Sequence, residues 1–68
     1  MRPFDQLQAE IQDTLEKIIR VNASIARHEA QEQPDELAIA QFEEIKVQFT
    51  QHLLALLAEM DIKLKVAA

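Results

Sequence analysis

The stretch HEAQEQPDELAIAQF, from His28 to Phe42, decides the fold of this 68-residue chain. It contains Pro34, one of two prolines in a sequence without glycine. A proline inside a helix costs about 3 kcal/mol and disfavours helix in the residue before it, whereas the first turn of a new helix tolerates it. The residues next to Pro34 are polar or charged, so this segment has no need of a core. The sequence therefore predicts a turn near residues 31–34.

Apolar residues before the turn recur at steps of three and four, as they do along one side of an α-helix. Pro3 suits the first helical position, and we expect a helix over about residues 3–31. Residues 19–25 alternate between apolar and polar like a strand, but no turn residues bound them and the helical period continues on both sides. The expected apolar stripe comprises Phe4, Leu7, Ile11, Leu15, Ile18 and Ile25.

The segment after the turn predicts a second helix over about residues 34–65. Asp35 and Glu36 fall in its first turn, and Lys63 and Lys65 fall in its last turn. Both placements suit the helix dipole, which favours acidic residues at the start and basic residues at the end. The main apolar stripe of this helix comprises Ala38, Phe42, Ile45, Phe49, Leu53, Leu56, Met60 and Leu64.

Two apolar stripes of similar length flank the turn, and they predict an all-α fold: an antiparallel two-helix hairpin in a single domain over residues 1–68. The alternative is one kinked helical rod in a coiled coil. The absence of glycine favours that alternative, because helices in hairpins often end at a glycine. Each helix of a hairpin buries only the strip that faces its neighbour, and the chain has no cysteine for a disulfide. Association between chains is therefore the expected source of further stability.

The second helix carries a further apolar strip, on a side that a single neighbouring helix does not cover. Val47 and Leu54 are one heptad apart and would stand in water in an isolated hairpin. The plain alternative is that scattered exposed apolar residues are normal on soluble proteins. We predict instead that this strip packs against a second copy of the chain, forming a homodimeric four-helix bundle. The predicted interface comprises Ala40, Val47, Leu54, Leu57 and Ala58.

Asn22 is the polar residue that interrupts the stripe of the first helix. It lies at the centre of the stripe if the helix is straight, and at its edge if the helix supercoils. A buried asparagine costs stability but can fix the register or the oligomeric state of a bundle. We predict that Asn22 is a partly buried, register-setting residue; the alternative is a solvated position at the edge of the stripe.

Residues that carry chemistry are few. The sequence has no glycine-rich phosphate loop, no serine or cysteine nucleophile beside a base, and no metal-binding motif. His28 and His52 lie at different heights in a hairpin, so one chain cannot bring them to a common ion. His28 with Glu29 and Glu32 is a weak alternative metal site, but a histidine near a helix C-terminus more commonly complements the dipole. We expect no enzymatic activity, no catalytic residue, no cofactor and no metal site.

The balance of charge disfavours several kinds of partner. Twelve acidic residues against seven basic ones give a net charge of −5, so the chain lacks the basic patch that binds nucleic-acid backbones or anionic membranes. The N-terminal segment has no apolar core like that of a signal peptide. No apolar run is long enough to span a bilayer. We expect a cytoplasmic protein that binds neither nucleic acid directly nor membranes.

The expected function is a non-enzymatic protein–protein interaction or structural module. Such a module would be a small homo-oligomeric helical bundle that acts as an adaptor or as a subunit of a larger assembly. The alternative is a small regulator of a nucleic-acid process that acts mainly through a protein partner. The basic residues that share one side of the first helix, Lys17, Arg20 and Arg27, are the candidates for that alternative.

Overall fold

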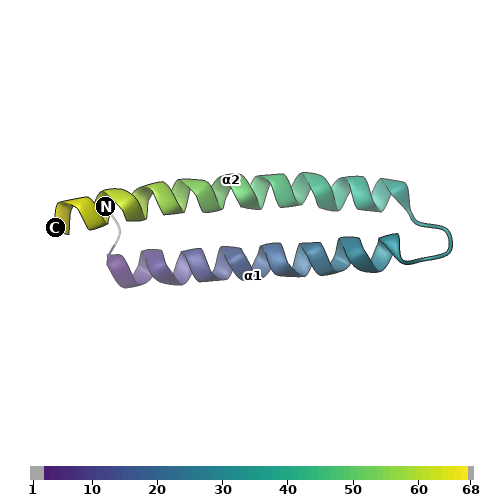
Figure 1. Cartoon of the computed structure of the whole chain (residues 1–68), viewed down its shortest axis with the longest axis horizontal. Coiled ribbons are helices and arrows are strands. Elements are labelled where there is room, and N and C mark those ends of the chain that lie inside the picture. The colour runs from purple at the N-terminus through teal and green to yellow at the C-terminus, as the bar shows by residue number, and fades with distance from the viewer. Residues whose placement is uncertain (1–2, 68) are drawn as a thin grey trace.

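A computed structural model describes residues 3–67 of the chain, with side chains described for residues 3–66. Within this range it contains two α-helices, α1 (Phe4–Glu29) and α2 (Glu36–Ala67). The helices run antiparallel and side by side, joined by one turn (Figure 1). The predicted all-α antiparallel hairpin is confirmed, and a continuous helix through Pro34 is excluded.

The turn is longer than predicted, and its capping residue is Asp35. The first helix ends at Glu29, two residues before its predicted end at residue 31. The second helix begins at Glu36, two residues after its predicted start at residue 34. The Asp35 side-chain Oδ1 accepts a hydrogen bond from the backbone N–H of Ala38 at 3.1 Å, as a helix N-cap does. Pro34 therefore precedes the cap and does not lie in the first helical turn.

The chain makes this turn without glycine and without left-handed backbone. Ala30 follows the last helical residue with φ −79° and ψ −8°, a right-handed conformation, and its N–H donates to the Ala26 carbonyl at 3.1 Å. Among residues 3–67 no residue has a positive φ. Residues 30–35 thus reverse the chain gradually, where a shorter connection would use a left-handed glycine at the end of the helix.

Contact between the helices follows a seven-residue repeat. Buried and half-buried side chains recur at alternating steps of three and four, the spacing typical of a left-handed supercoil. The rings of His28 and Phe42 lie 5.3 Å apart between centroids, and Lys17 Nζ lies 5.9 Å from the centroid of the Phe49 ring. The seam consists of Leu7, Ile11, Thr14, Ile18, Val21, Ile25 and His28 in α1, and of Ile39, Phe42, Lys46, Phe49, Leu53, Leu56, Met60 and Lys63 in α2.

This repeat corrects the stripe expected for α1. Leu15, which a straight helix would place toward the core, is 45% exposed, whereas its neighbour Thr14 is 2% exposed. On a straight helix, residues seven apart are displaced around the helix by about 20°, so a seven-residue stripe turns away from the neighbouring helix. Supercoiling of the two helices keeps such a stripe in the seam. The Thr14 hydroxyl donates to the Glu10 carbonyl of the preceding turn at 2.8 Å, so burial leaves it hydrogen-bonded.

The same correction applies to α2. Ile45 and Leu64, expected in its main stripe, are exposed. Lys46 and Lys63, each next to one of them, are half-buried in the seam. A lysine can hold such a position because its long apolar stem lies along the partner helix while its ammonium group reaches water. The seam of the hairpin is therefore less apolar than a straight-helix stripe predicts.

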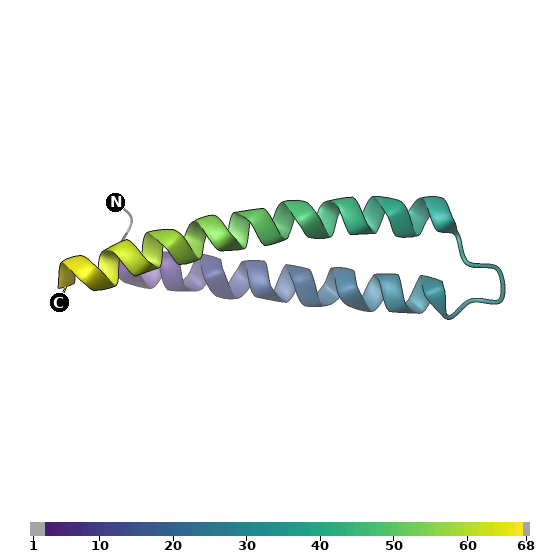
Figure 2. The ribbon, with the colours of Figure 1, turned by 45° about the horizontal axis from the view of Figure 1, so that its top comes forward.

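The hairpin is a rod with a small core. It measures 53 × 15 × 15 Å, and its radius of gyration is 15.6 Å, against about 11 Å for a compact chain of this length. Figure 2 shows the two helices along the length of the rod, with the C-terminal end of α2 projecting past the start of α1. The buried apolar side chains among the described residues are Leu7, Val21, Ile25 and Leu56.

Candidate interaction surface

The described residues form neither a pocket nor a cluster of possible metal ligands. No cavity lies between or beside the helices over residues 3–67, and no three His, Cys, Asp or Glu side chains of that range come together. Neither described helix has a stretch long and apolar enough to cross a membrane. The outer surface of the rod is therefore where the described side chains can meet a partner.

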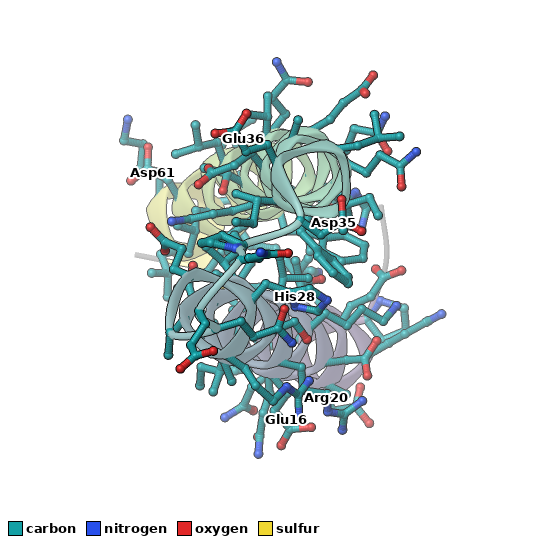
Figure 3. All side chains as sticks on the ribbon, turned by 90° about the vertical axis from the view of Figure 1, so that its right-hand side faces the viewer. Glu16, Arg20, His28, Asp35, Glu36 and Asp61 are labelled. Atoms are coloured by element: carbon teal, nitrogen blue, oxygen red, sulfur yellow. The ribbon has the colours of Figure 1, made fainter. Side chains whose placement is uncertain are left out.

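The rod has two lateral sides, which the seven-residue repeat defines. In heptad notation the seam residues occupy positions a and d of each helix. In an antiparallel pair the e and b positions of both helices line one side, and the g and c positions line the other. Viewed from the turn, Asp61, at a b position, lies on the left and Arg20, at a c position, lies at the lower right (Figure 3).

One side carries no charged residue over its central part, and we call it the uncharged face. It includes five large apolar side chains, each between 44% and 65% exposed. Charged residues appear only toward its ends, with Asp5 and Asp61 at one end and Glu29 and Glu43 at the other. The uncharged face comprises Gln8, Gln12, Leu15, Ile19 and Asn22 of α1, and Val47, Thr50, Leu54 and Leu57 of α2.

The antiparallel register joins the two halves of this face. The ring contacts across the seam place Leu15 close to the height of Leu54, and Ile19 close to the height of Val47. Leu57 lies one turn beyond Leu54. At 1.5 Å per residue these five side chains form a band about 15 Å long near the middle of the rod.

The opposite side is the charged face. Lys17 Nζ lies 3.1 Å from Asp13 Oδ2, and Arg20 Nη2 lies 3.9 Å from Glu16 Oε2 at the outer edge of the same helix. Arg27 donates from Nη2 to the Ser24 hydroxyl at 3.2 Å. The charged face comprises Glu10, Asp13, Lys17, Arg20 and Arg27 of α1, and Ile45, His52, Glu59 and Ile62 of α2.

The residues predicted for the interface are all exposed in the hairpin. Val47 and Leu54 lie in the centre of the uncharged face and Leu57 lies beside them. Ala40 continues the line of Val47 toward the turn, and Ala58 lies on the outer edge of α2. The structure therefore brings the large members of the predicted set together on one side of the rod.

Leu15 and Ile19 belong to the same band but were not predicted to lie in the interface. A straight-helix stripe assigns Leu15 to the core and leaves Ile19 without a role. The signal that finds both is the seven-residue spacing of Leu7, Thr14 and Val21, which places Leu15 one residue outside the seam. The band is thus shared by both helices, whereas the strip predicted from the sequence lies on the second helix alone.

Asn22 lies on the uncharged face and is exposed, while Val21 beside it occupies the seam. The hairpin therefore gives Asn22 no place between α1 and α2. A register-setting role for Asn22 requires a second chain on the uncharged face.

His28 has a local structural role at the end of α1. Its Nδ1–H donates to the Ser24 carbonyl at 2.7 Å, and its ring packs on Phe42. This position is in the last turn, where a basic side chain complements the helix dipole. Glu29 and Glu32, the other members of the weak alternative metal site, are exposed.

Comparisons with known proteins supply no relative on which to model this surface. No protein-family model, no curated protein and no solved structure matches the chain. The chemistry of the surface is therefore the basis for a functional proposal.

Proposed function

We propose that this chain is a non-enzymatic interaction or structural module that folds as a homodimeric four-helix bundle. It acts in the cytoplasm as an adaptor or as a subunit of a larger assembly. The observation that carries the proposal is the uncharged face. It exposes five large apolar side chains in one band, on a rod whose described residues bury only four.

The size of the rod's lateral side fits an interface between two copies. A rod 53 Å long and 15 Å wide has a side of about 800 Å² in outline, close to the area that each partner contributes to a standard interface. The chain exposes 5123 Å² of accessible surface, whereas a compact monomer of this mass exposes about 4,400 Å². The surplus is of the size that an interface with a second copy would bury.

The energy of burial points the same way. Fully burying a Val, Leu or Ile side chain is worth about 1.5–3 kcal/mol, and these side chains are roughly half buried already. Ten of them in a dimer then contribute roughly 7–15 kcal/mol, against an association cost of about 4–15 kcal/mol. The two magnitudes are comparable, so we expect folding and dimerisation to be one process.

A second candidate function is a small regulator of a nucleic-acid process that acts mainly through a protein partner. The pairing on the charged face favours a protein partner over direct contact with nucleic acid. Lys17 and Arg20 each have an acidic neighbour on their own helix, and this lowers their attraction for phosphates.

The first test is the molar mass of the chain in solution. Light scattering at micromolar concentration should give a molar mass twice the 7.8 kDa of one chain. The Leu54→Glu variant should have a lower molar mass, closer to that of a single chain. Affinity capture from the native host then tests the adaptor role, with the wild type and with Ile62→Glu, an exposed position on the charged face at which the dimer should persist. A defined partner that both proteins retain at a fixed ratio to the dimer supports the adaptor role. A folded wild-type monomer contradicts the proposal.

A further inference from the structure

We propose that two copies pack through their uncharged faces with their turns at opposite ends of the bundle. Helix α1 then faces α1 of the partner, and α2 faces α2 of the partner. This inference rests on the proposed homodimer and adds an orientation to it.

The uncharged face is self-complementary about one height of the rod. Leu15 and Ile19 on α1 and Val47 and Leu54 on α2 form two pairs, and the midpoints of both pairs lie at nearly the same height. A two-fold axis in the interface at that height packs Leu15 against Ile19 of the partner subunit and Val47 against Leu54 of the partner subunit. The operation repeats each contact and closes the dimer.

The apolar band does not choose the orientation by itself. If both turns lay at the same end, the α1 part of the band would face the α2 part of the partner's band, because the two parts have similar heights. Apolar side chains would meet apolar side chains in that arrangement as well. The choice therefore depends on charge.

The turn is an acidic tip. Residues 28–36 contain four acidic residues and no lysine or arginine, whereas the rest of the chain contains eight acidic and seven basic residues, for the total charge of −5. Most of the net charge therefore lies at one end of the rod. The four acidic residues of the tip, Glu29, Glu32, Asp35 and Glu36, are all exposed.

With both turns at the same end, the two acidic tips would lie about 10 Å apart, the usual distance between packed helices. The Debye length at physiological ionic strength is about 8 Å, so each single pair of charges at this distance is largely screened. The repulsion is therefore the sum of many weak terms, because four exposed carboxylates on one tip face four on the other. With the turns at opposite ends, the tips lie about 45–50 Å apart at 1.5 Å per residue. Each tip then lies beside the open end of the partner, where Lys63 and Lys65 offset the charges of Asp5 and Asp61, and where Lys65 Nζ lies 2.9 Å from Asp61 Oδ2.

Distance measurement between spin labels tests this orientation. The chain has no cysteine, so Gln33→Cys at the tip and Gln51→Cys near the two-fold height each introduce one labelling site. Both positions are exposed, so neither label disturbs the seam. We expect about 45–50 Å between tip labels, and a distance below about 35 Å between the central labels.

The two labels separate failure of the orientation from failure of the dimer. A tip distance below about 25 Å, together with a short central distance, would overturn the orientation and leave the dimer in place. Two distances at the tip would also overturn it, because both orientations would then be populated. The absence of any intermolecular distance at either site, at a concentration well above micromolar, would overturn the homodimer itself.

Discussion

The uncharged and charged faces of the rod come from the same two helices and the same heptad spacing, yet their side chains have different partners. On the charged face Lys17 contacts Asp13 and Arg20 lies near Glu16, so these charges are balanced within α1. On the uncharged face Leu54 and Ile19 project into water and have no comparable partner among residues 3–66. The distribution of charge, more than the count of exposed apolar residues, therefore distinguishes a solvated side from one suited to a second chain.

Exposed apolar residues occur on the charged face as well. Ile45 and Ile62 are exposed there, but that side also carries five charged residues of α1, from Glu10 to Arg27. Desolvating these charges would cost more than burying two isoleucines contributes. Substitutions matched across the two faces should therefore have unequal effects.

The largest expected difference is between Leu54→Glu and Ile62→Glu. Both replace an exposed apolar residue of α2 by the same charged one, on opposite faces. Leu54→Glu removes from the dimer two leucines worth together about 1.5–3 kcal/mol, since each is partly buried already, and it also buries charge. We therefore expect a loss of at least about 3 kcal/mol, or 100-fold or more in the dissociation constant. Ile62→Glu should stay within about 0.5 kcal/mol. Sedimentation equilibrium measures the dissociation constant of each variant, and circular dichroism measures its stability. Equal effects of the two substitutions would show that the faces do not differ.

The next largest effect is expected on α1, from Ile19→Ser compared with Arg20→Ser. The two residues are adjacent and both exposed. Serine has about the helix propensity of isoleucine and a lower one than arginine, so propensity alone would make Arg20→Ser the more destabilising change. Ile19→Ser should weaken the dimer by about 10–100-fold, since two isoleucines leave the interface. Arg20→Ser should change the dissociation constant by less than about threefold. An unchanged dimer with Ile19→Ser would confine the interface to α2.

Asn22→Leu should have a smaller and opposite effect on affinity. The substitution extends the apolar band toward the turn and should tighten the dimer by up to about tenfold. Because a polar residue in an interface can fix its register, the variant should also populate a shifted register, while the charges of the tips keep the turns at opposite ends. Spin labels at Gln33→Cys would then show a second long distance, displaced by about 10 Å for a shift of one heptad. A single long distance in the variant would mean that Asn22 has no register-setting role.

The smallest effect is expected on the charged face. Lys17→Gln removes the ion pair with Asp13, and exposed i,i+4 pairs contribute about 0.3–0.5 kcal/mol. The melting temperature should fall by about 1–3 °C, with no change in molar mass. Molar salt should reduce the difference between variant and wild type. A tenfold loss of dimer affinity would instead place Lys17 in the interface.

Local chemistry made much of the fold predictable from the sequence. Pro34 stands in a polar segment between two helical stripes, and that combination is enough to predict a reversal of the chain. The residues at which the turn begins and ends were harder to predict, because the start of the second helix depends on the hydrogen bond from the Ala38 N–H to Asp35. Asp35 fits the first turn of a helix and the N-cap equally well by sequence alone.

The interaction surface was only partly predictable. Val47 and Leu54 were predictable as exposed because they lie outside the stripe of their own helix. Leu15 and Ile19 were not, because their place depends on supercoiling and on the register between two helices. Thr14 made the seven-residue repeat hard to recognise in the sequence, because a hydroxyl residue interrupts the apolar pattern of the seam.

The most direct test of the central claim, that the chain folds by dimerising through its uncharged face, is the concentration dependence of thermal unfolding. Circular dichroism melts over a hundredfold range of concentration measure it. For a dimer that folds as it associates, each tenfold increase in concentration adds about 1.4 kcal/mol and should raise the melting temperature by about 3–6 °C. Leu54→Glu should be largely unfolded over the same range. A cooperative melting temperature that is independent of concentration in both proteins would contradict the account.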